Sequence, residues 1–217
     1  MKTVTPKRID SLRDKALAVL RQAIVHLKYS PGSVVSEAEL IATVGLGRTP
    51  VREAVGRLEQ EGFVAVLPRK GILITPITLL DLQTLCELRM ELEGLGARLA
   101  AERRTPAQLE ELQTMFKGAP ALIAANDLPQ LLDLDRDFHM LLAQSTKNRY
   151  LEETLSRLYS NSLRYWYISF SHAGFLDEVL QEHEVIIASV AEQRGQEAEA
   201  AMRHHVRRFK EKVIQSL

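Results

Sequence analysis

The sequence predicts a mostly helical protein with two domains. Residues 8–75 are expected to form three helices and a two-stranded hairpin, residues 76–78 a linker, and residues 79–217 an antiparallel bundle of six helices. Two observations support this fold class. Apolar residues recur at three- and four-residue steps along most of the chain, which is the period of one face of a helix. The period becomes that of strands only after Gly62.

The composition excludes several classes of protein. The chain has 217 residues, of which 46% are hydrophobic and 26% charged, and this is enough for two domains with cores. No apolar run approaches the roughly 20 residues of a membrane span, and the Met1-Lys2-Thr3 start lacks the apolar region of a secretory signal. A single cysteine, Cys86, can form no internal disulfide and fits a reducing compartment. We therefore expect a cytoplasmic protein with no membrane partner.

The charges are divided unevenly along the chain, although the formal net charge is +0. Residues 1–76 carry 12 Lys and Arg against 7 Asp and Glu, whereas residues 77–217 carry 16 against 21. A basic first third joined to an acidic remainder is typical of a nucleic-acid-binding head on a body that does not contact phosphate.

One amphipathic helix is expected from Arg8 to Tyr29, after a frayed tail of residues 1 to 7. Its apolar residues recur at helical spacing, so that one face would pack under the elements that follow. The tripeptide Ser30-Pro31-Gly32 ends the pattern, because proline lacks an N–H and glycine favours turns.

A short second helix is expected after Ser36. The hydroxyl of Ser36 can accept from the backbone, and Glu39, three residues later, can reach back to the N–H of Ser36. Gly45 ends this helix, because a left-handed backbone conformation is needed there.

The next helix begins in Gly47-Arg48-Thr49-Pro50, with Thr49 as its expected cap and a proline in its first turn, and runs to Gly62. Two short helices joined by a glycine turn are typical of a helix-turn-helix, in which the second helix lies in the major groove of DNA. We expect Arg48, Thr49 and Arg52 to contact DNA from this recognition helix.

A hairpin is expected after the recognition helix. Phe63–Leu67 and Ile72–Ile74 are predicted to be strands, joined by the turn Pro68-Arg69-Lys70-Gly71. A hairpin in this place is a wing, and its tip Arg69-Lys70-Gly71 would fit a minor groove. Any one of these cations could equally be a solvated surface residue, but the helices, the wing and the charge distribution together favour DNA binding.

The run from Pro31 to Gly71 resembles the winged-helix domain of the GntR family of bacterial transcription regulators, and Arg48-Thr49-Pro50-Val51-Arg52-Glu53 is a specific match. The resemblance implies a homodimer that binds a double-stranded DNA operator. Two positions depart from the family's pattern. Ala38 stands where some members place an Arg that contacts DNA, and Gly47 stands where a Ser commonly caps the recognition helix.

From Leu79 onward the sequence predicts helices and no strands. The six expected helices span about Leu79–Arg103, Pro106–Lys117, Leu128–Ser145, Arg149–Phe170, Phe175–Gln193 and Gln196 to the C-terminus. Six helices with short connections are typical of an antiparallel bundle, whose centre can hold a buried site.

Three of these helices carry residues of the metal-binding type among apolar neighbours. Asp135 and His139 are four residues apart, hence about one turn apart on one helix face. His183 lies on the fifth helix and the pair His204-His205 on the sixth. One carboxylate and three imidazoles could bind a divalent transition metal. Each histidine could equally be an ordinary core or surface residue, so spacing alone leaves both interpretations open.

Residues 79–217 resemble the helical effector domain called FCD, which accompanies this winged helix in the FadR branch of the GntR family. The matching pieces are Glu87-Leu88-Arg89 with Glu93, Asp135 with Phe138-His139, Asn148, His183 with Ile186, and Met202 with His205. Many members hold a metal with one Asp and three His, and this pattern falls on Asp135, His139, His183 and His205. The implied ion is a divalent transition metal, with zinc expected first and nickel or manganese as alternatives. The count of six helices resembles the VanR-like subgroup.

The family's effectors are typically small organic acids, so the resemblance implies a carboxylate bound to the metal and balanced by nearby cations. Arg89 is the first expected partner of this carboxylate, because Arg can donate two parallel hydrogen bonds, and Arg164 is the second. Alternatively, Arg89 forms a helix-surface pair with Glu93, four residues later. The fourth helix also carries aromatic residues that could belong to the core, a dimer seam or a ligand pocket: Tyr159, Tyr165, Trp166 and Tyr167.

The sequence therefore predicts a ligand-responsive transcription regulator, and repression is the commoner mode in the resembling family. Two alternatives stay open: the metal itself could be the signal, or the second domain could be a metalloenzyme with Glu182 or Glu184 as a base. Neither glutamate shares the helical face of His183, because adjacent residues on a helix diverge by about 100°. No nucleophile or nucleotide-binding motif is present, so no enzymatic activity is expected.

Overall fold

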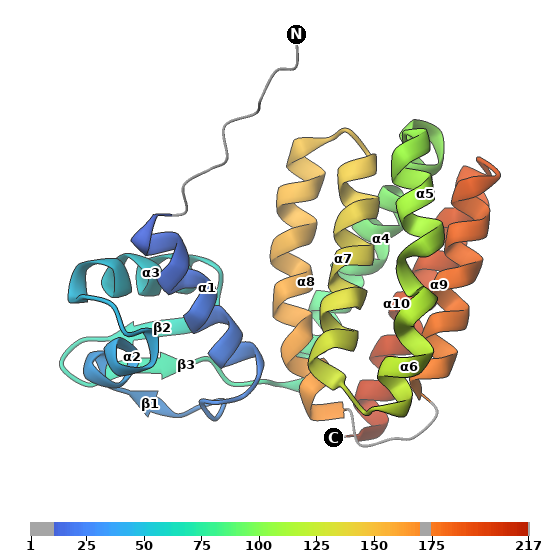
Figure 1. Cartoon of the computed structure of the whole chain (residues 1–217). Coiled ribbons are helices and arrows are strands. Elements are labelled where there is room, and N and C mark those ends of the chain that lie inside the picture. Colours follow the sequence, from blue (N-terminus) through green and yellow to red (C-terminus); the bar gives the residue numbers. More distant parts are fainter. Residues whose placement is uncertain (1–10, 170–174, 217) are drawn as a thin grey trace, which may run out of the picture. The chain divides into compact units, whose positions relative to one another are not determined.

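The computed structural model describes residues 11–169 and 175–216, and Figure 1 shows their helices and strands. The chain divides into two compact units, Met1–Ile77 and Thr78–Leu217. Helices make up most of both units, and every strand that the structure describes belongs to unit 1. The mostly helical fold class is therefore confirmed. No helix in the described residues is long and apolar enough to cross a membrane.

Unit 1 consists of three helices and a small antiparallel sheet. Its elements are α1 (Leu12–Val25), β1 (Val34–Val35), α2 (Glu37–Val44), α3 (Arg48–Gln60), β2 (Val64–Leu67) and β3 (Gly71–Ile74). The strand order is β1-β3-β2, so the predicted wing strands β2 and β3 do pair. The structure adds β1, whose Val34 and Val35 pair with Leu73 and Ile72 of β3.

The first helix is shorter than predicted. Ser11 caps α1 through a capping box with Asp14, so the helix starts at Leu12 rather than at Arg8, and residues 8 to 10 lie outside the described part of the chain. The helix ends at Val25 rather than at Tyr29, and Leu27 has a φ of 54°. A residue in the left-handed conformation cannot continue a right-handed helix. The apolar pattern of the sequence therefore extends beyond the last residue of α1.

The second helix begins and ends as predicted. Ser36 and Glu39 form the capping box, and Gly45 has a φ of 69° at the C-terminal cap of α2. The third helix differs in its first turn, because Gly47 is the N-cap and makes no side-chain hydrogen bond. Thr49 lies inside α3 and does not cap it, which corrects the prediction.

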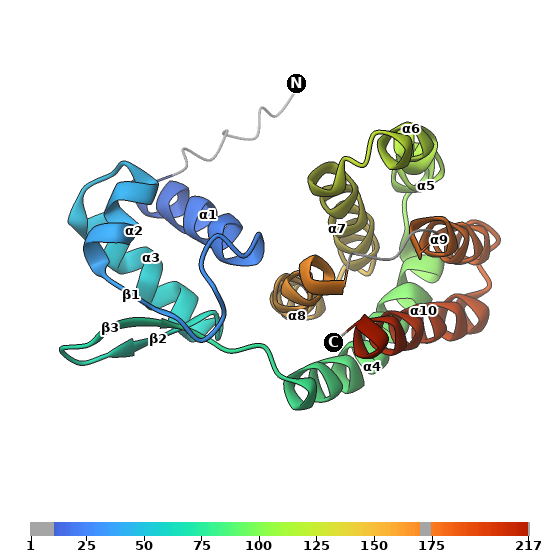
Figure 2. The ribbon, with the colours of Figure 1, turned by 90° about the horizontal axis from the view of Figure 1, so that it is seen from below.

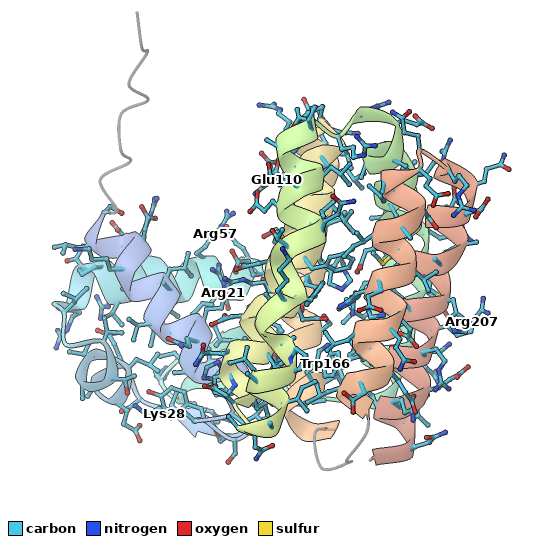
Figure 3. The ribbon with its side chains drawn as sticks, turned by 45° about the vertical axis from the view of Figure 1, so that its right-hand side comes forward. Arg21, Lys28, Arg57, Glu110, Trp166 and Arg207 are labelled. Atoms are coloured by element: carbon cyan, nitrogen blue, oxygen red, sulfur yellow. The ribbon has the colours of Figure 1, made fainter. Side chains whose placement is uncertain are left out.

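An ion-pair bridge joins the first and third helices. Glu61, the C-cap residue of α3, has its carboxylate 2.7 Å from Arg21 Nη2 of α1 and 3.1 Å from Arg57 Nε of α3. Both arginines are labelled in Figure 3. Buried apolar residues from all three helices form the core of unit 1, including Leu20, Ile24, Leu40, Val51 and Leu58. The core holds the recognition helix in place.

The sheet needs a glycine at Gly71. This residue has a φ of 119°, and a Cβ added to it would lie 2.7 Å from the carbonyl oxygen of Val35. Only a residue without a side chain allows β1 to approach β3 so closely. Gly71 therefore has a structural role in the sheet, at the end of the turn that carries Arg69 and Lys70.

The connection between the two units is short. Thr75 donates its hydroxyl to the carbonyl oxygens of Gly62 (2.9 Å) and Phe63 (3.0 Å), so it is anchored in unit 1. Thr78 accepts from the N–H of Asp81 and caps the first helix of unit 2. Only Pro76 and Ile77 lie between these two anchored residues.

Unit 2 is a helical bundle. Its elements are α4 (Leu79–Arg103), α5 (Pro106–Met115), η1 (Phe116–Gly118), α6 (Ala119–Ala124), α7 (Leu128–Ser145), α8 (Arg149–Ser169), α9 (Phe175–Ala191) and α10 (Gly195–Ser216). The six predicted helices are present, and the structure adds the short turn η1 and the six-residue α6. Figure 2 shows α4 and α10 side by side, with α7, α8 and α9 around the same centre.

Candidate functional site

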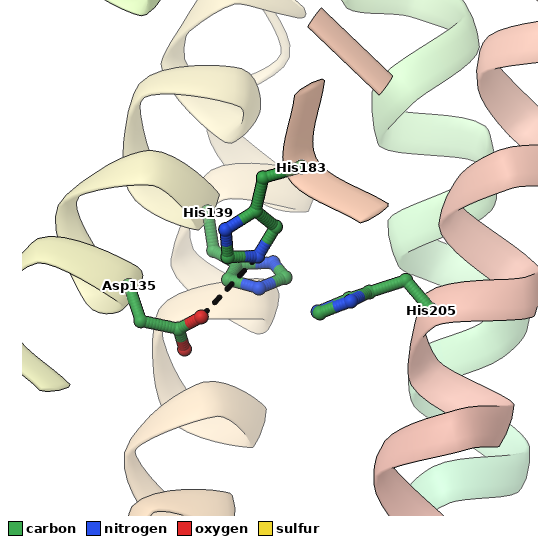
Figure 4. Close-up of side chains that lie close together, drawn as sticks. All are labelled: Asp135, His139, His183 and His205. Atoms are coloured by element: carbon green, nitrogen blue, oxygen red, sulfur yellow. Dashed lines mark ion pairs between the residues drawn. The ribbon is translucent and has the colours of Figure 1, made fainter. Parts of the chain in front are cut away.

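Four predicted metal-binding residues come together in the centre of unit 2. The ligand atoms of Asp135, His139, His183 and His205 all lie within 4.8 Å of one another, and all four residues are buried. Figure 4 shows their side chains pointing toward a common point from three helices. Asp135 and His139 are one turn apart on α7, whereas His183 comes from α9 and His205 from α10. His204, the neighbour of His205, is exposed.

Two of the imidazoles are oriented by carboxylates. His139 Nδ1 lies 2.7 Å from Glu93 Oε2, and His205 Nδ1 lies 2.8 Å from Glu182 Oε2. An Nδ1–H that donates to a carboxylate fixes the tautomer and leaves Nε2 as the metal-binding atom. His205 therefore presents Nε2 to the cluster, whereas His139 Nδ1 and Glu93 Oε2 lie close together without a hydrogen-bond partner among the described residues.

His183 is oriented by aromatic rings instead. Its ring stacks on Phe116 with centroids 4.9 Å apart, and the ring of Phe138 lies 4.3 Å away. Its Nε2 lies 3.3 Å from Asp135 Oδ1, the contact drawn in Figure 4. Burial lowers the pKa of His183 well below its usual value, and the nearby His205 and His139 lower this pKa further. A neutral imidazole is the form that binds a metal ion.

The Asp135 carboxylate is held on its other oxygen. The hydroxyl of Tyr159, a buried residue of α8, donates to Asp135 Oδ2. Burial raises the pKa of Tyr159 well above its usual value, and the charge of Asp135 raises this pKa further. The phenol therefore stays a donor, and it leaves Oδ1 facing the cluster.

Arg89 and Glu93 form a buried ion pair on α4. Arg89 Nε donates to Glu93 Oε1, and both residues are buried, so this is not the surface pair that the spacing suggested. Burial alone would raise the pKa of the Glu93 carboxyl, but Arg89 and His139 lower it overall. Arg89 Nη1 has no hydrogen-bond partner among the described residues. One donor of a buried guanidinium is thus left for a ligand.

The four donors fit a divalent transition metal. Buried nitrogens without a hydrogen-bond partner in the described chain include both ring nitrogens of His139 and both of His183. Buried polar atoms are almost always paired, so several unpaired atoms at one point indicate a missing partner. One carboxylate oxygen and three imidazole nitrogens are the ligand set of zinc and its neighbours in the first transition row.

The second expected effector residue lies in a different environment. Arg164 is buried on α8, and burial lowers its pKa, whereas Tyr165 and Asp81 act in the opposite direction. Asp81 belongs to the first turn of α4. Of the aromatic residues on α8, Tyr159, Tyr165 and Trp166 are buried, and Tyr165 lies 3.4 Å from the carbonyl oxygen of Thr78.

The recognition helix presents two paired arginines. Arg48 and Arg52 are 71% and 63% exposed, and their Nε atoms lie 3.2 and 2.8 Å from the two carboxylate oxygens of Glu37 on α2. Exposed pairs contribute only about 0–1 kcal/mol, so phosphate or base contacts can replace them at small cost. Thr49 is exposed between the two arginines. The turn residues Arg69 and Lys70 are also exposed, and Arg69 has a φ of 62°.

The sequence did not predict the contacts that orient the metal-binding side chains. The pairings of Glu93 with His139 and of Tyr159 with Asp135 join different helices, so they depend on how each helix is rotated. Glu182 had been considered only as a base, and its side chain instead contacts His205. One indication in the sequence points to Glu37 as the partner of Arg48 and Arg52, namely its position at the start of α2, one turn before Leu40.

Comparisons with known proteins agree with this architecture. Residues 12–74 match the model of bacterial regulatory proteins of the gntR family, and residues 84–208 match the FCD domain. The chain is 29% identical to the HTH-type transcriptional repressor RspR of Escherichia coli K12, over 91% of this chain and 86% of that protein. It is 33% identical to a transcriptional regulator in an unstable DNA locus of Streptomyces ambofaciens, over 87% of this chain and 79% of that protein.

Solved structures show the same fold. The structure of E. coli McbR/YncC aligns with a TM-score of 0.85 at 20% identity, covering 94% of this chain and 98% of that one. A GntR regulator from Rhodococcus sp. RHA1 aligns with a TM-score of 0.77 at the same identity and coverage. On the two family matches, which together span most of the sequence, the chain belongs to the GntR family of bacterial transcription regulators and carries an FCD domain as its second unit.

Proposed function

We propose that this DNA-binding regulator is a repressor whose operator affinity changes when a small organic acid binds at a metal ion in the FCD domain. One observation carries the proposal: four buried ligand atoms of the metal-binding type lie within 4.8 Å of one another. Buried imidazole nitrogens without a hydrogen-bond partner, as in His139 and His183, are unfavourable in a folded core unless a cation joins them.

Asp135, His139, His183 and His205 would hold the ion, and zinc is the proposed metal, with nickel or manganese as alternatives. When bound, the metal supplies a positive charge and an open coordination position for a carboxylate oxygen. Neighbouring residues of the chain hold these four side chains in the orientation that a metal ion needs. Glu93 and Glu182 orient two imidazoles, and Tyr159 holds the carboxylate of Asp135.

Arg89 is the proposed partner of the acid's second oxygen. It is buried, its Nη1 has no partner among the described residues, and its Glu93 neighbour contacts the metal ligand His139. A charge-assisted hydrogen bond to a carboxylate would satisfy this donor. Arg164 is kept as a second candidate.

DNA contact is proposed for Arg48, Thr49 and Arg52 in the major groove and for the wing tip Arg69-Lys70-Gly71 in the minor groove. A homodimer would place two such heads on half-sites of a two-fold operator. Repression is proposed because RspR, a relative of this chain, is named a repressor. Membership of the VanR-like subgroup rests on the six described helices of ten or more residues in unit 2.

The test is to measure operator affinity of the metal-loaded protein by fluorescence anisotropy, with and without a panel of small carboxylates. We expect at least one acid to change the affinity, and treatment with a chelator to abolish the change. If affinity follows metal concentration with no acid present, the metal is the signal. If neither acid nor chelator has an effect, the proposed regulation is wrong.

A further inference from the structure

One carboxylate on α2 pairs with both arginines of the recognition helix. Arg52 Nε donates to Glu37 Oε2 at 2.8 Å, and Arg48 Nε lies 3.2 Å from Glu37 Oε1. The two arginines are four residues apart on α3, so they lie one turn apart on the same helix face. Each oxygen of Glu37 therefore faces one guanidinium, and a single acidic residue pairs with both.

The start of α2 fixes the position of Glu37. It is the first residue of this helix and follows the N-cap Ser36, whose capping box with Glu39 holds the backbone there. Leu40, one turn later, is buried in the core of unit 1. A carboxylate in the first turn is also stabilised by the positive end of the helix dipole. The Glu37 side chain is 31% exposed, so it lies at the same surface as the two arginines.

Both contacts to Glu37 are made by Nε of the arginine. A guanidinium has five N–H donors, and Nε carries only one of them. The donors on the two Nη groups can therefore contact the O6 and N7 atoms of a guanine while Nε stays with the carboxylate. Pairing with Glu37 is thus compatible with base readout by Arg48 and Arg52.

Contact with a phosphate has a different electrostatic cost. A phosphate is negatively charged, whereas the edge of a guanine is not, so a carboxylate beside the guanidinium repels the phosphate more strongly than the base. Glu37 also reduces the charge of this group of three side chains from +2 to +1. Binding to DNA of any sequence depends on phosphate contacts, whereas base contacts distinguish the operator.

We propose that Glu37 is a specificity-determining residue of the DNA-binding head. It weakens the phosphate contacts of Arg48 and Arg52 more than their base contacts, and so increases the preference for the operator over other DNA. This inference rests on the proposed contact of these arginines with DNA. It adds the acidic residue that sets their selectivity.

The test is Glu37→Gln in the full chain, with affinity measured by fluorescence anisotropy at several salt concentrations. One duplex is selected by the unaltered protein from a randomised library, and the other is a random sequence of equal length. The variant should bind the random duplex roughly three- to fivefold more tightly, which is the scale of an exposed ion pair. The slope of log affinity against log salt should become steeper by up to about 0.9, the contribution of one phosphate contact. Affinity for the selected duplex should rise less or fall.

Glu53→Gln is the matched control. Glu53 is exposed on α3, but the acidic partner of both arginines is Glu37. The control removes the same charge, and we expect it to leave the ratio of the two affinities unchanged. In an Arg52→Ala background, Glu37→Gln should tighten binding to the random duplex less than in the unaltered protein, because one of its two partners is absent.

The outcomes separate this inference from the DNA contact on which it rests. If Glu37→Gln tightens binding to both duplexes equally, Glu37 does not determine specificity. An unchanged affinity for the random duplex, or an equal change in the Glu53→Gln control, would also overturn the inference. If Arg48→Ala and Arg52→Ala both leave affinity for the selected duplex unchanged, the proposed DNA contact itself fails.

Discussion

Arg52 lies exposed on the recognition helix, with its Nε 2.8 Å from a carboxylate oxygen of Glu37. Arg52→Ala should weaken operator binding by about 1–3 kcal/mol, because a guanidinium in the major groove can donate to both guanine and phosphate. Fluorescence anisotropy with an operator duplex measures this loss. Arg57→Ala, on the same helix but paired with Glu61, is the control of equal charge change. Equal losses in both variants would contradict the docking model.

His183 contributes the imidazole that lies between Phe116 and Phe138. His183→Ala should lower zinc content to well below one ion per chain and abolish the response to acid, because one of four ligands is lost. Elemental analysis of the purified protein measures the metal. His204, the exposed neighbour of His205, supplies the control. His204→Ala should keep full zinc content. Full occupancy in the His183 variant would remove this residue from the site.

Cys86 is fully buried on α4. Burial raises the pKa of its thiol, and although Arg89 opposes this, Glu93 adds to it. Since the thiolate is the nucleophile, a raised pKa of the thiol reduces the reactive fraction at pH 8. The native protein should therefore react with a disulfide reagent far more slowly than the protein in guanidinium chloride, as absorbance of the released thiol would show. Equal rates would mean that unit 2 opens readily around α4.

Single residues of the site were predictable only in part. The donors Asp135 and His139 share a helix and a face, so their proximity follows from helical geometry. Residues that orient the donors could not be predicted in this way. Glu93 reaches His139 from α4, and Glu182 reaches His205 from α9. Such contacts depend on the rotation of each helix in the bundle, and the sequence fixes that rotation only to within a broad apolar stripe.

At the scale of elements, locally encoded boundaries were predicted well. The capping box of Ser36 with Glu39 and the left-handed Gly45 bound α2 as expected, because a few adjacent residues determine both ends. The strand β1 was missed, since its two residues become a strand only by pairing with β3, far along the chain. The end of α1 was also misplaced, because Val25 is followed by no glycine or proline signal until Pro31.

Two glycines of unit 1 should respond to alanine in opposite directions. Gly71→Ala should destabilise the protein by about 1–3 kcal/mol, because the residue has a positive φ and its Cβ would meet the Val35 carbonyl. Gly56 lies inside α3 with nothing within 4 Å of an added Cβ. Gly56→Ala should therefore stabilise by up to about 1 kcal/mol. Urea unfolding measures both, and a destabilised Gly56→Ala variant would contradict the open space at that position.

At the scale of the whole molecule, the two units must communicate if acid binding is to alter DNA affinity. Inserting Gly-Ser-Gly-Ser between Pro76 and Ile77 should preserve acid affinity but bring the operator affinities with and without acid close together, because a flexible linker transmits no conformational bias. The same insertion between Ala125 and Asn126, in the turn before α7, is the control and should keep the response. A full response from the linker variant would show that coupling does not pass through the linker.

The length of that connection has a mechanical consequence. Thr75 is held by the carbonyls of Gly62 and Phe63, and Thr78 caps α4, so the connection from Thr75 to Thr78 spans three residue steps and can extend to at most roughly 11 Å. The ring of Pro76 fixes its own φ, so the soft torsions of the connection are ψ of Thr75, ψ of Pro76, the two dihedral angles of Ile77 and φ of Thr78. Such a short connection allows the two units to rotate relative to each other but keeps them close together. We expect a change in unit 2 that is transmitted through this connection to reach the DNA as a reorientation of unit 1.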